Sequence, residues 1–581
     1  MRYDHVEIGR TGSRGKRYAF VTDEKVGGAT YTPAALADFV AARMIDAAGL
    51  HHNPRSVRIL DPAVGEGELL ASLLAQLPDD VRIDVCGFDT DRRALHSTEA
   101  RLRSAFPGVS LDLRTGDFLK FVLDMCSGVG PGLFFDAGAA ETFDLIIANP
   151  PYVRTQVMGA KHAQRLAATF GLHGRVDLYY AFLVAISMVL RPHGVAGIIV
   201  SNRFMTTRAG ATVRRAIRAG FNLRQVWDLG DTKLFSAAVL PAVLIGEGKN
   251  GDDGGNVQFT SIYESTEPAR HSSASIIDAL EHTGVVEVPD GRRFHVRSGT
   301  LDSSSGSSAV WRIATNATDA WLETVSTHTW RRFGEIGKIR VGVKTCADGV
   351  FIRDDWDKLP QNERPELLRP LITHHVARRF RADESRAGRR ILYPHESIGG
   401  QRRAVELDEY PRSKAYLTRH RSVLESRSYV LEAGRHWYEI WVPQDPATWR
   451  KPKLVFRDIA KEPCFWVDFA GAVVNGDCYW IAIEDESLLW LAAAVANSTF
   501  IRSFYDHRFH NKLYAGRRRF ITQYVEAFPL PHPESETAAE IIQGARAMYS
   551  TAGTPNCELR FAELDGLVWS AFGLTLEEVA R

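Results

Sequence analysis

The residues with the clearest chemical potential stand next to one another and are Asn149, Pro150, Pro151 and Tyr152. They follow a largely apolar run, 143–148, whose length and composition predict a buried strand. Each proline fixes its φ angle and lacks an N–H, so the pair predicts a rigid turn with a carbonyl that can accept a hydrogen bond. An ordinary turn would need neither a side-chain amide nor an aromatic ring at these positions.

This turn could hold an amine that is to be methylated. The amino nitrogen of adenine is a poor nucleophile because its lone pair is delocalised into the ring. The Asn149 side-chain oxygen and the Pro150 carbonyl could accept its two hydrogens and direct the lone pair toward a methyl donor, while Tyr152 stacks on the base. A sulfonium methyl group is already activated, so no strong general base is needed and catalysis is chiefly positioning.

A short loop earlier in the chain could hold the methyl donor. Its candidate ligand-binding residues are Asp61, Ala63, Gly65, Glu66 and Gly67. The glycines allow a ligand to approach the backbone at the start of the next predicted helix. A dinucleotide fingerprint would have a third glycine where Leu70 stands, and Glu66 would repel a pyrophosphate while tolerating an ammonium group. Taken alone, the loop also fits an ordinary strand-turn-helix connection.

Two acids follow the next two predicted strands. Asp89 comes about 20 residues after the glycines, where a ribose diol binds in a doubly wound sheet. Asp117 could accept a hydrogen bond from an adenine amino group while the neighbouring Phe118 ring packs on the base. Each acid could instead cap a helix. Because ligands bind at the carboxyl ends of strands in open α/β sheets, the ordered strand ends together predict one cofactor site.

The elements that must position these residues alternate between short apolar runs and helical patterns, which predicts an α/β fold with a mostly parallel sheet. The predicted strands are Val57–Leu60, Ile83–Phe88, Leu111–Arg114, Phe143–Ala148, Val195–Val200, Gln225–Leu229 and Val239–Ile245. The predicted helices include Pro33–Ala48, Leu69–Ala75, Arg92–Ala105 and Leu178–Leu190. About nine residues join the last two strands, too few for a parallel crossover, so these strands should form an antiparallel hairpin.

Length and composition divide the chain. Its 581 residues exceed what one hydrophobic core usually supports, so at least two domains are expected. We expect an N-terminal arm at residues 1–29 and the α/β domain at 30–250. A glycine- and serine-rich linker or transition should follow at 251–309, and an irregular domain rich in aromatic and basic residues at 310–581.

Charge and cysteine content exclude several classes of protein. The formal net charge of +1 gives no global signature of a polyanion partner, although local clusters can still bind phosphates. The six cysteines lack zinc spacing, so reduced thiols and no metal site are expected. The first residues do not form a signal peptide and no apolar run would cross a bilayer, so we expect a cytoplasmic protein without a membrane partner.

These motifs, in this order, resemble those of the gamma-class adenine-N6 DNA methyltransferases of restriction–modification systems, the TaqI-like group. The resemblance implies the class I S-adenosylmethionine methyltransferase fold, a Rossmann-like seven-stranded sheet with an antiparallel last strand, followed by a mixed α/β target-recognition domain. The residues that match the family's cofactor elements are Tyr31, Thr32, Pro33, Asp61, Ala63, Gly65, Glu66, Gly67, Asp89, Asp117, Phe118 and Asn149. The implied cofactor is therefore S-adenosylmethionine.

The resemblance continues after the tetrapeptide. Residues 177–182 and 190–194 are similar to the family's next helix and turn. Phe235 lies in the predicted hairpin, where the family carries an aromatic ring that packs on the other face of a flipped base. A core phenylalanine is the alternative interpretation of Phe235.

The second half of the chain should hold DNA. An amine inside a duplex is out of reach of such a pocket, so the base must be flipped out, which requires a surface that grips the duplex. Residues from 342 onward, and 496–531 in particular, resemble the family's carboxyl-terminal specificity domain. Arginine suits phosphates and guanine edges, although a single basic cluster is more often solvated surface. The predicted DNA contacts are Arg378, Arg379, Arg402, Arg403, Lys512, Arg517, Arg518 and Arg519.

The expected partner is double-stranded DNA, and a restriction or phage-defence system would add protein partners. Two other functions share parts of the pattern. Glutamine N5-methyltransferases also hold a nitrogen with Asn-Pro-Pro-Tyr, but they are much shorter and have no use for an arginine-rich second half. A catalytically silent DNA-binding subunit would not need an intact Asn149 or Tyr152. Only about 30 residues precede the first cofactor motif, so no nuclease activity is expected.

Overall fold

The computed structural model describes most of the chain. The described residues are 32–49, 56–78, 80–126, 142–153, 160–172, 177–207, 209–235, 240–249, 255–301, 310–509, 512–513, 516–554 and 557–576. They divide into two compact units: unit 1 comprises the chain up to 309 apart from 206–208 and 263–266, and unit 2 comprises those two short segments together with 310–581. None of the described helices is long and apolar enough to cross a membrane.

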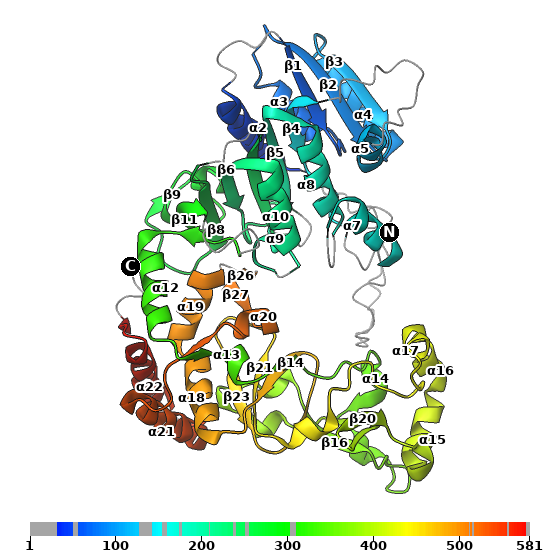
Figure 1. Ribbon diagram of the computed structural model, residues 1–581, viewed down its shortest axis with the longest axis vertical. Helices are drawn as coiled ribbons and strands as arrows, with labels where there is room; N and C mark the ends of the chain where they lie inside the picture. Colours follow the sequence, from blue (N-terminus) through cyan, green and yellow to red (C-terminus); the bar gives the residue numbers. More distant parts are fainter. Residues whose placement is uncertain are drawn as a thin grey trace, which may run out of the picture. The chain divides into compact units, whose positions relative to one another are not determined.

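Unit 1 is built on a mixed sheet whose strand order is β3-β2-β1-β4-β5-β7-β6-β8-β11-β10-β9 (Figure 1). The first five strands pair in parallel, whereas β7 is antiparallel to both β5 and β6. The bounds are β1 Ser56–Asp61, β2 Arg82–Asp89, β3 Ser110–Thr115, β4 Phe143–Ala148, β5 Leu190–Ser201, β6 Phe221–Asp228, β7 Pro241–Gly248, β8 Gln258–Glu264, β9 His271–Ser272, β10 Gly284–Glu287 and β11 Arg293–Leu301.

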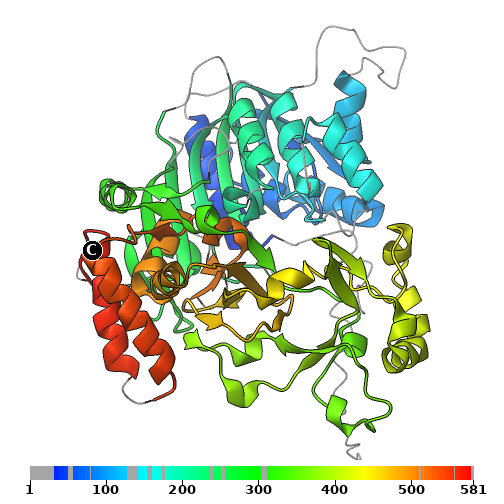
Figure 2. The ribbon, with the colours of Figure 1, turned by 60° about the horizontal axis from the view of Figure 1, so that its bottom comes forward.

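Helices cover both faces of this sheet (Figure 2). α2 packs against α3 and β5 on one face, and α8 lies between α5 and α10 on the other. Gly197 of β5 allows the close approach of α2, because a Cβ there would lie 2.3 Å from the sulfur of Met44. The bounds are α2 Ala34–Ala48, α3 Glu68–Leu74, α4 Arg92–Ala105, α5 Phe118–Cys126, α7 Ala160–Thr169, α8 Leu178–Val189, α9 Arg203–Thr206, α10 Ala211–Gly220 and α11 Ile276–Ala279.

The sequence-based strands of unit 1 are confirmed, because each predicted run overlaps one of β1 to β7. The antiparallel pairing of the last two is also confirmed, with Val226 opposite Leu244. The segment 251–309 differs from the expected linker or transition, because it contains β8, β9, β10 and β11. These strands continue the same sheet beyond β6, so the sheet is larger than the seven strands expected. In β8 and β11 polar residues interrupt the apolar ones, a weaker signal than the continuous apolar runs of the earlier strands.

Unit 2 combines small sheets with helices. The sheet orders are β14-β25-β21-β23-β17, β15-β18-β16-β24, β22-β27-β26, β13-β28 and β19-β20. The strand bounds are β12 Ile313–Ala314, β13 Arg331–Arg332, β14 Ile339–Val341, β15 Ile352–Arg353, β16 Leu368–Ile372, β17 Phe380–Arg381, β18 Arg390–Leu392, β19 His395–Ile398, β20 Gln401–Ala404, β21 Lys453–Arg457, β22 Ile459–Ala460, β23 Phe465–Asp468, β24 Val473–Val474, β25 Cys478–Ala482, β26 Lys512–Leu513, β27 Arg517–Arg519 and β28 Pro529–Leu530.

Several helices of unit 2 pack into one large apolar cluster, and others contribute to a second cluster. The large cluster joins α18 and α19 with the antiparallel pair α21 and α22, and the second cluster is centred on Trp356, Trp449 and Trp480. The helix bounds are α12 Asn316–Thr327, α13 Phe333–Ile336, α14 Asp348–Phe351, α15 Pro411–Arg419, α16 Arg421–Glu425, α17 Ser428–Glu432, α18 Glu486–Asn497, α19 Thr499–Phe509, α20 Thr522–Val525, α21 Glu536–Thr551 and α22 Cys557–Ala571.

Candidate active site

The predicted site residues of unit 1 follow strands that end at one edge of the sheet. Asp61 ends β1 and Asp89 ends β2, while Asp117 and Asn149 come shortly after β3 and β4. Because these strands are parallel, their carboxyl ends share that edge. The structure therefore brings these side chains to the place where open α/β sheets bind ligands.

The glycine loop is held by the two acids that flank it. Asp61 accepts a hydrogen bond from the Ala63 N–H at 3.0 Å, and Asp89 accepts one from the Gly65 N–H at 2.8 Å. Gly65 has a φ of +52°, which disfavours any residue with a Cβ. The loop backbone is thus shaped by its own carboxylates, and each carboxylate oxygen can accept further hydrogen bonds.

Asp61 is an unusual buried acid. Asp61 is 0% exposed, and among the described residues its Oδ2 atom has no hydrogen-bond partner, whereas Oδ1 accepts from Ala63. Burial, opposed by the Ala63 N–H and reinforced by the charge of Asp89, raises the Asp61 pKa from 3.8 to about 7. A buried carboxylate oxygen without a donor is costly, so this atom indicates a place where a ligand could supply one.

Helix α4 fixes the far side of the loop. Thr98 donates to the Gly65 carbonyl at 2.9 Å, and Arg101 donates to the Glu66 carbonyl. Gly67 has a φ of +73°, and a Cβ there would lie 2.3 Å from a methyl group of Thr98. Only glycine fits at this position, and the Glu66 side chain is left exposed.

Asp117 and Phe118 have different surroundings. Asp117 is exposed, and its Oδ1 accepts a hydrogen bond from the Leu119 N–H at 2.9 Å. This contact fits the alternative interpretation of Asp117 as a helix cap. Phe118 is only 1% exposed, and its ring packs against Phe88 and Phe182 at centroid distances of 5.8 and 5.7 Å. These contacts and this burial are typical of a core residue, and the packing of Phe118 on a base stays a prediction.

A hydrogen-bonded chain fixes the side-chain amide of Asn149. Its Nδ2 donates to the Thr32 hydroxyl at 3.0 Å, and its Oδ1 lies 2.8 Å from the Tyr152 hydroxyl. The Tyr152 hydroxyl also lies 3.2 Å from the Ile199 carbonyl and can donate to either oxygen. Thr32 precedes α2, so the cofactor element before α2 and the catalytic turn after β4 meet through a direct contact.

The turn after β4 is braced by α8 and β5. The Leu178 N–H at the start of α8 donates to the Val153 carbonyl at 3.0 Å. The Tyr152 ring packs edge-on against Tyr179, whose hydroxyl contacts the Ser201 carbonyl at 3.4 Å. Burial raises the pKa of Tyr152, so its hydroxyl stays neutral.

Two residues at the same edge were missed by the sequence analysis. Asn202 follows β5 and donates to Asp228, the last residue of β6, at 2.8 Å. Asp228 also accepts from the Gly230 N–H at 3.2 Å and so shapes the start of the loop between β6 and β7. Polar residues at strand ends had identified Asp89, and the same rule would have found this pair.

Phe235 occupies that loop but lies in the core. Its side chain is 5% exposed and belongs to the apolar cluster that includes α2 and the sheet. The core interpretation therefore fits better than a ring that faces a base. Tyr31, which precedes Thr32 and is a predicted cofactor residue, lies outside the described residues, as do residues 236–239.

The arginines predicted to contact DNA all lie in unit 2, and several are structural. Arg518 is 7% exposed and forms two hydrogen bonds with Asp506, at 2.7 and 2.6 Å. Arg519 pairs with Asp458 at 3.1 Å. Arg517 is exposed and has no ion pair among the described residues. In this cluster Arg518 and Arg519 are therefore bound to carboxylates of the protein, whereas Arg517 is exposed to solvent.

The other predicted DNA contacts also include residues with protein partners and exposed residues. Arg378 donates to the Arg381 and Ala382 carbonyls at 3.2 Å each, and Arg379 lies over the Phe561 ring. In the hairpin β19–β20, Arg403 pairs with Glu396 at 2.8 Å, whereas Arg402 is exposed. The Lys512 backbone belongs to β26, but its side chain lies outside the described residues.

The strand order is that of the class I methyltransferase fold, an α/β sheet in which β7 runs antiparallel between β5 and β6. The fold is similar to two solved structures at a TM-score of 0.50. One is a cryo-electron microscopy structure of a DrdV–DNA complex, 12% identical, covering 91% of this chain and 57% of that one. The other is a nuclease-deletion mutant of the Type ISP restriction-modification enzyme LlaGI with a DNA substrate mimic, 11% identical, covering 90% and 55%.

Sequence comparison gives the family. The model described as Eco57I restriction-modification methylase matches residues 97–235. Type II methyltransferase M.BanIII of Aneurinibacillus aneurinilyticus is 37% identical over 576 residues, covering 95% of this chain and 98% of that protein. Type II methyltransferase M.PaeR7I of Pseudomonas aeruginosa is 24% identical, covering 87% and 86%. The chain belongs to the Type II DNA methyltransferases of restriction–modification systems.

Proposed function

We propose that the protein transfers a methyl group from S-adenosylmethionine to N6 of a flipped-out adenine in double-stranded DNA. The observation that carries the proposal is the fixed amide of Asn149 at the carboxyl end of β4. With Nδ2 bound to Thr32, Oδ1 is directed away from that contact, and a carbonyl-type oxygen can accept two hydrogen bonds. An oxygen held in this way can accept from an amine and raise its nucleophilicity.

The strand-end residues fit the cofactor. We propose that Asp89 binds the ribose diol and that the unpartnered oxygen of Asp61 lies where the cofactor's positive charge can compensate it. The N–H groups and glycines of the loop would border the methionine part, with Glu66 exposed beside them. When bound, the cofactor supplies an activated methyl group on sulfur, and the protein positions the amine relative to that group.

The protein's own residues then have separate tasks. Thr32 and Tyr152 orient the Asn149 amide, and the Pro150 carbonyl adds a second acceptor for the amine. The Tyr152 ring would stack on the base on the side away from Tyr179. A general base is not required, because the amine proton is lost after the methyl group is transferred.

The experiment is methylation of DNA in a host that lacks adenine methylation. We expect N6-methyladenine in nucleoside digests analysed by mass spectrometry and at one sequence context in sequenced DNA. The Asn149→Ala variant should lower transfer by at least about 10²-fold, by analogy with loss of one preorganised donor or acceptor, while calorimetric binding of S-adenosylmethionine is retained. Arg560→Ala, at an exposed position of α22, is the matched control and should leave transfer unchanged.

Other outcomes would exclude the proposal. N4-methylcytosine in place of N6-methyladenine would refute the base, and methylated glutamine in a protein would favour the N5-methyltransferase alternative. Normal transfer by the Asn149→Ala variant would remove that residue from the mechanism. Binding of DNA without any transfer would favour a catalytically silent subunit.

A further inference from the structure

Unit 2 carries a short hairpin whose two strands, β19 and β20, form a sheet of their own (Figure 1). The strands pair in antiparallel register, and the pair Ile398–Gln401 lies next to the turn. Gly399 and Gly400 form this two-residue turn with φ angles of +59° and +77°, and a tight hairpin turn of type I′ requires positive values at both positions. Apart from chain neighbours, no described atom lies within 4 Å of a Cβ built on either glycine, so the turn packs against no described element.

The base of the hairpin, by contrast, is fixed by buried contacts. His395 at the start of β19 is 2% exposed, and its Nε2 accepts from the Ile440 N–H at 3.0 Å. Directly after β20, the Val405 carbonyl accepts from the Tyr438 hydroxyl at 2.9 Å. An isolated two-stranded hairpin is only marginally stable in water, so these contacts support it. The exposed end is therefore preorganised, which lowers the entropy lost when it binds a ligand.

The register places the side chains of the hairpin on two faces. Residues opposite one another in an antiparallel pair share a face, and successive pairs alternate between the faces. One face carries the ion pair between Glu396 and Arg403, at 2.8 Å, and nearer the turn Ile398 opposite Gln401. The other face carries Arg402.

Three exposed side chains lie close to the turn. Ile398 is 49% exposed, and Gln401 and Arg402 are exposed as well. Arg402 has no ion pair within the described part of the chain, whereas the charge of Arg403 is offset by Glu396. The end of the hairpin therefore presents an apolar group and an amide on one face and a cation on the other.

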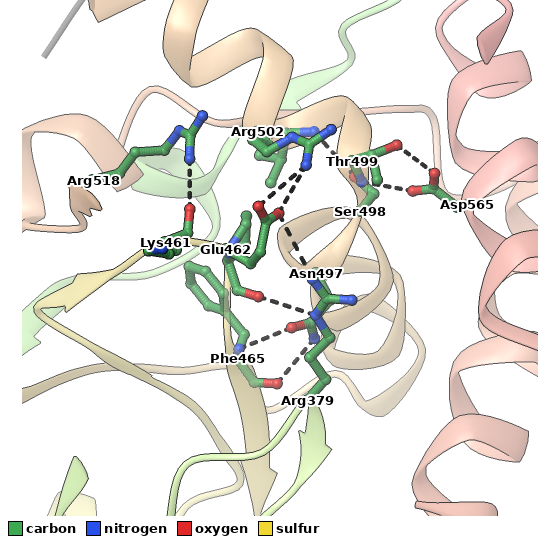
Figure 3. Close-up of polar contacts among 12 residues, drawn as sticks. Arg379, Lys461, Glu462, Phe465, Asn497, Ser498, Thr499, Arg502, Arg518 and Asp565 are labelled. Atoms are coloured by element: carbon green, nitrogen blue, oxygen red, sulfur yellow. Dashed lines mark hydrogen bonds and ion pairs between the residues drawn. The ribbon is translucent and has the colours of Figure 1, made fainter. Parts of the chain in front are cut away.

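Several other arginines of unit 2 are engaged by the protein itself (Figure 3). Glu462 pairs with Arg502 at 3.1 Å and lies 3.9 Å from Arg379. Arg518 donates to the Lys461 carbonyl. These guanidinium groups would have to break contacts of the scaffold to reach a ligand, and the arginine near the hairpin turn would break no ion pair.

We propose that the hairpin β19–β20 enters the major groove of duplex DNA and that its two faces have different tasks. A two-stranded ribbon fits this groove. The face with Ile398 and Gln401 is electrically neutral, because its charged residues form an ion pair. It suits base edges, since a glutamine amide can bind N6 and N7 of adenine and an apolar side chain can contact the methyl group of thymine. Arg402, on the other face, suits a backbone phosphate.

This role of the hairpin rests on the proposed function only in taking duplex DNA as the partner. It adds Ile398 and Gln401 to the predicted DNA contacts and assigns Arg402 to a phosphate. It removes Arg403, whose partner is Glu396. The predicted consequence is that sequence preference and salt dependence can be changed separately by substitutions at neighbouring positions.

Selection from a library of duplexes with randomised sequence tests the neutral face. Duplexes that bind the wild-type protein or the Gln401→Ala variant are recovered and sequenced. The variant should lose about tenfold of its discrimination at one base pair and keep the rest of the motif. A variant with the wild-type motif and discrimination would overturn base reading by Gln401, and so would a wild-type protein that selects no motif.

Fluorescence anisotropy at a series of KCl concentrations tests the cationic face. Arg402→Ala should keep the motif, bind every duplex more weakly and lower the salt slope by about one, because a phosphate contact is independent of sequence. Arg560→Ala, at an exposed position of α22, is the control and should leave the motif and the slope unchanged. A wild-type slope in Arg402→Ala would overturn the phosphate contact, and a changed motif would overturn the assignment of the two faces.

A shortened hairpin tests both faces together. Deleting residues 397–398 and 401–402 removes two register pairs and keeps the Gly399–Gly400 turn above the Glu396–Arg403 pair. The shortened protein should keep its melting temperature, since the buried base is unchanged, and should lose the selected motif. Selection of the full motif by this protein would overturn the proposed role of the hairpin. A wild-type protein that selects a motif but does not methylate adenine would refute the proposed reaction and leave that role standing.

Discussion

Two buried ion pairs of unit 2 differ from one buried acid of unit 1. Unit 2 contains two buried ion pairs: Lys453 pairs with Asp468 at 2.7 Å, and Arg518 pairs with Asp506. Burial, together with the charge of Arg402, lowers the pKa of the buried His395 to about 3, so it stays neutral. In unit 1, by contrast, Asp61 is fully buried and one of its oxygens has no hydrogen-bond donor within the part of the chain that the structure describes.

This difference separates scaffold from site. A buried ion pair whose partners satisfy one another leaves nothing for a ligand, even when its arginine stands in a basic run of sequence. A buried acid with an unsatisfied oxygen retains an unfavourable interaction that a ligand can remove. The contrast predicts that substitutions in unit 2 pairs change folding, whereas substitutions at the unit 1 edge change binding and catalysis.

The largest expected effect concerns the Arg518–Asp506 pair. Arg518→Ala leaves a buried carboxylate unpaired and should lower the unfolding free energy by about 3–5 kcal/mol. Arg517→Ala, one residue away, should change it by less than about 0.5 kcal/mol. Urea unfolding followed by tryptophan fluorescence reports on unit 2, which contains every tryptophan except Trp227. Equal effects of the two substitutions would break the distinction between scaffold and surface.

The next effect concerns Asp61 and pH. Folding raises the pKa of Asp61 from 3.8 to about 7. Between these two pH values the carboxyl group is therefore protonated in the folded protein and ionised in the unfolded chain. Stability due to this group is therefore highest at low pH and falls as the pH rises toward 7. A cationic ligand favours the ionised form, so S-adenosylmethionine should bind more tightly as the pH rises from 6 to 8, by up to about tenfold per unit below the pKa.

Calorimetry in two buffers of different ionisation enthalpy would detect the coupled release of a proton. The Asp61→Asn variant should bind without this release and with a flatter pH profile. If the variant kept the wild-type pH dependence, Asp61 would not be the group that responds to the cofactor.

The smallest effect concerns Thr32. Thr32→Val removes the acceptor for the Asn149 amide and should cost about 1 kcal/mol in the transition state, or about a fivefold lower kcat with little change in KM for DNA. Thr32→Ser keeps the hydroxyl and should restore the rate. A separate measurement of cofactor affinity distinguishes this positioning role from direct binding. Equal rates for the valine and serine variants would show that the hydroxyl does not orient Asn149.

Local patterns in the sequence predicted unit 1 well. Continuous apolar runs such as Phe143–Ala148 form buried strands, and the short connection before β7 forces an antiparallel pair. The placement of Asp61, Asp89 and Asn149 follows from strand direction alone, which the sequence already indicates. The cofactor and catalytic roles of these residues stay predictions.

Long-range contacts were not predictable in the same way. Asp458 lies 61 residues before Arg519, so nothing near the basic run reveals that its second and third arginines are paired. Phe118 and Phe235 are aromatic residues beside expected ligands, but their burial depends on neighbours such as Phe182 that only the folded chain supplies. Sequence indicates which residue types are present; their availability depends on the tertiary structure.

The continuation of the unit 1 sheet beyond β6 also protects the protein from aggregation. β6 pairs in parallel with β8, with Val226 opposite Phe259, and the far edge of the sheet is β9, a two-residue strand of exposed polar residues. Short polar edges discourage pairing with another molecule. A chain cut at residue 250 would instead leave the eight-residue strand β6 as the edge of the sheet, and we expect it to self-associate.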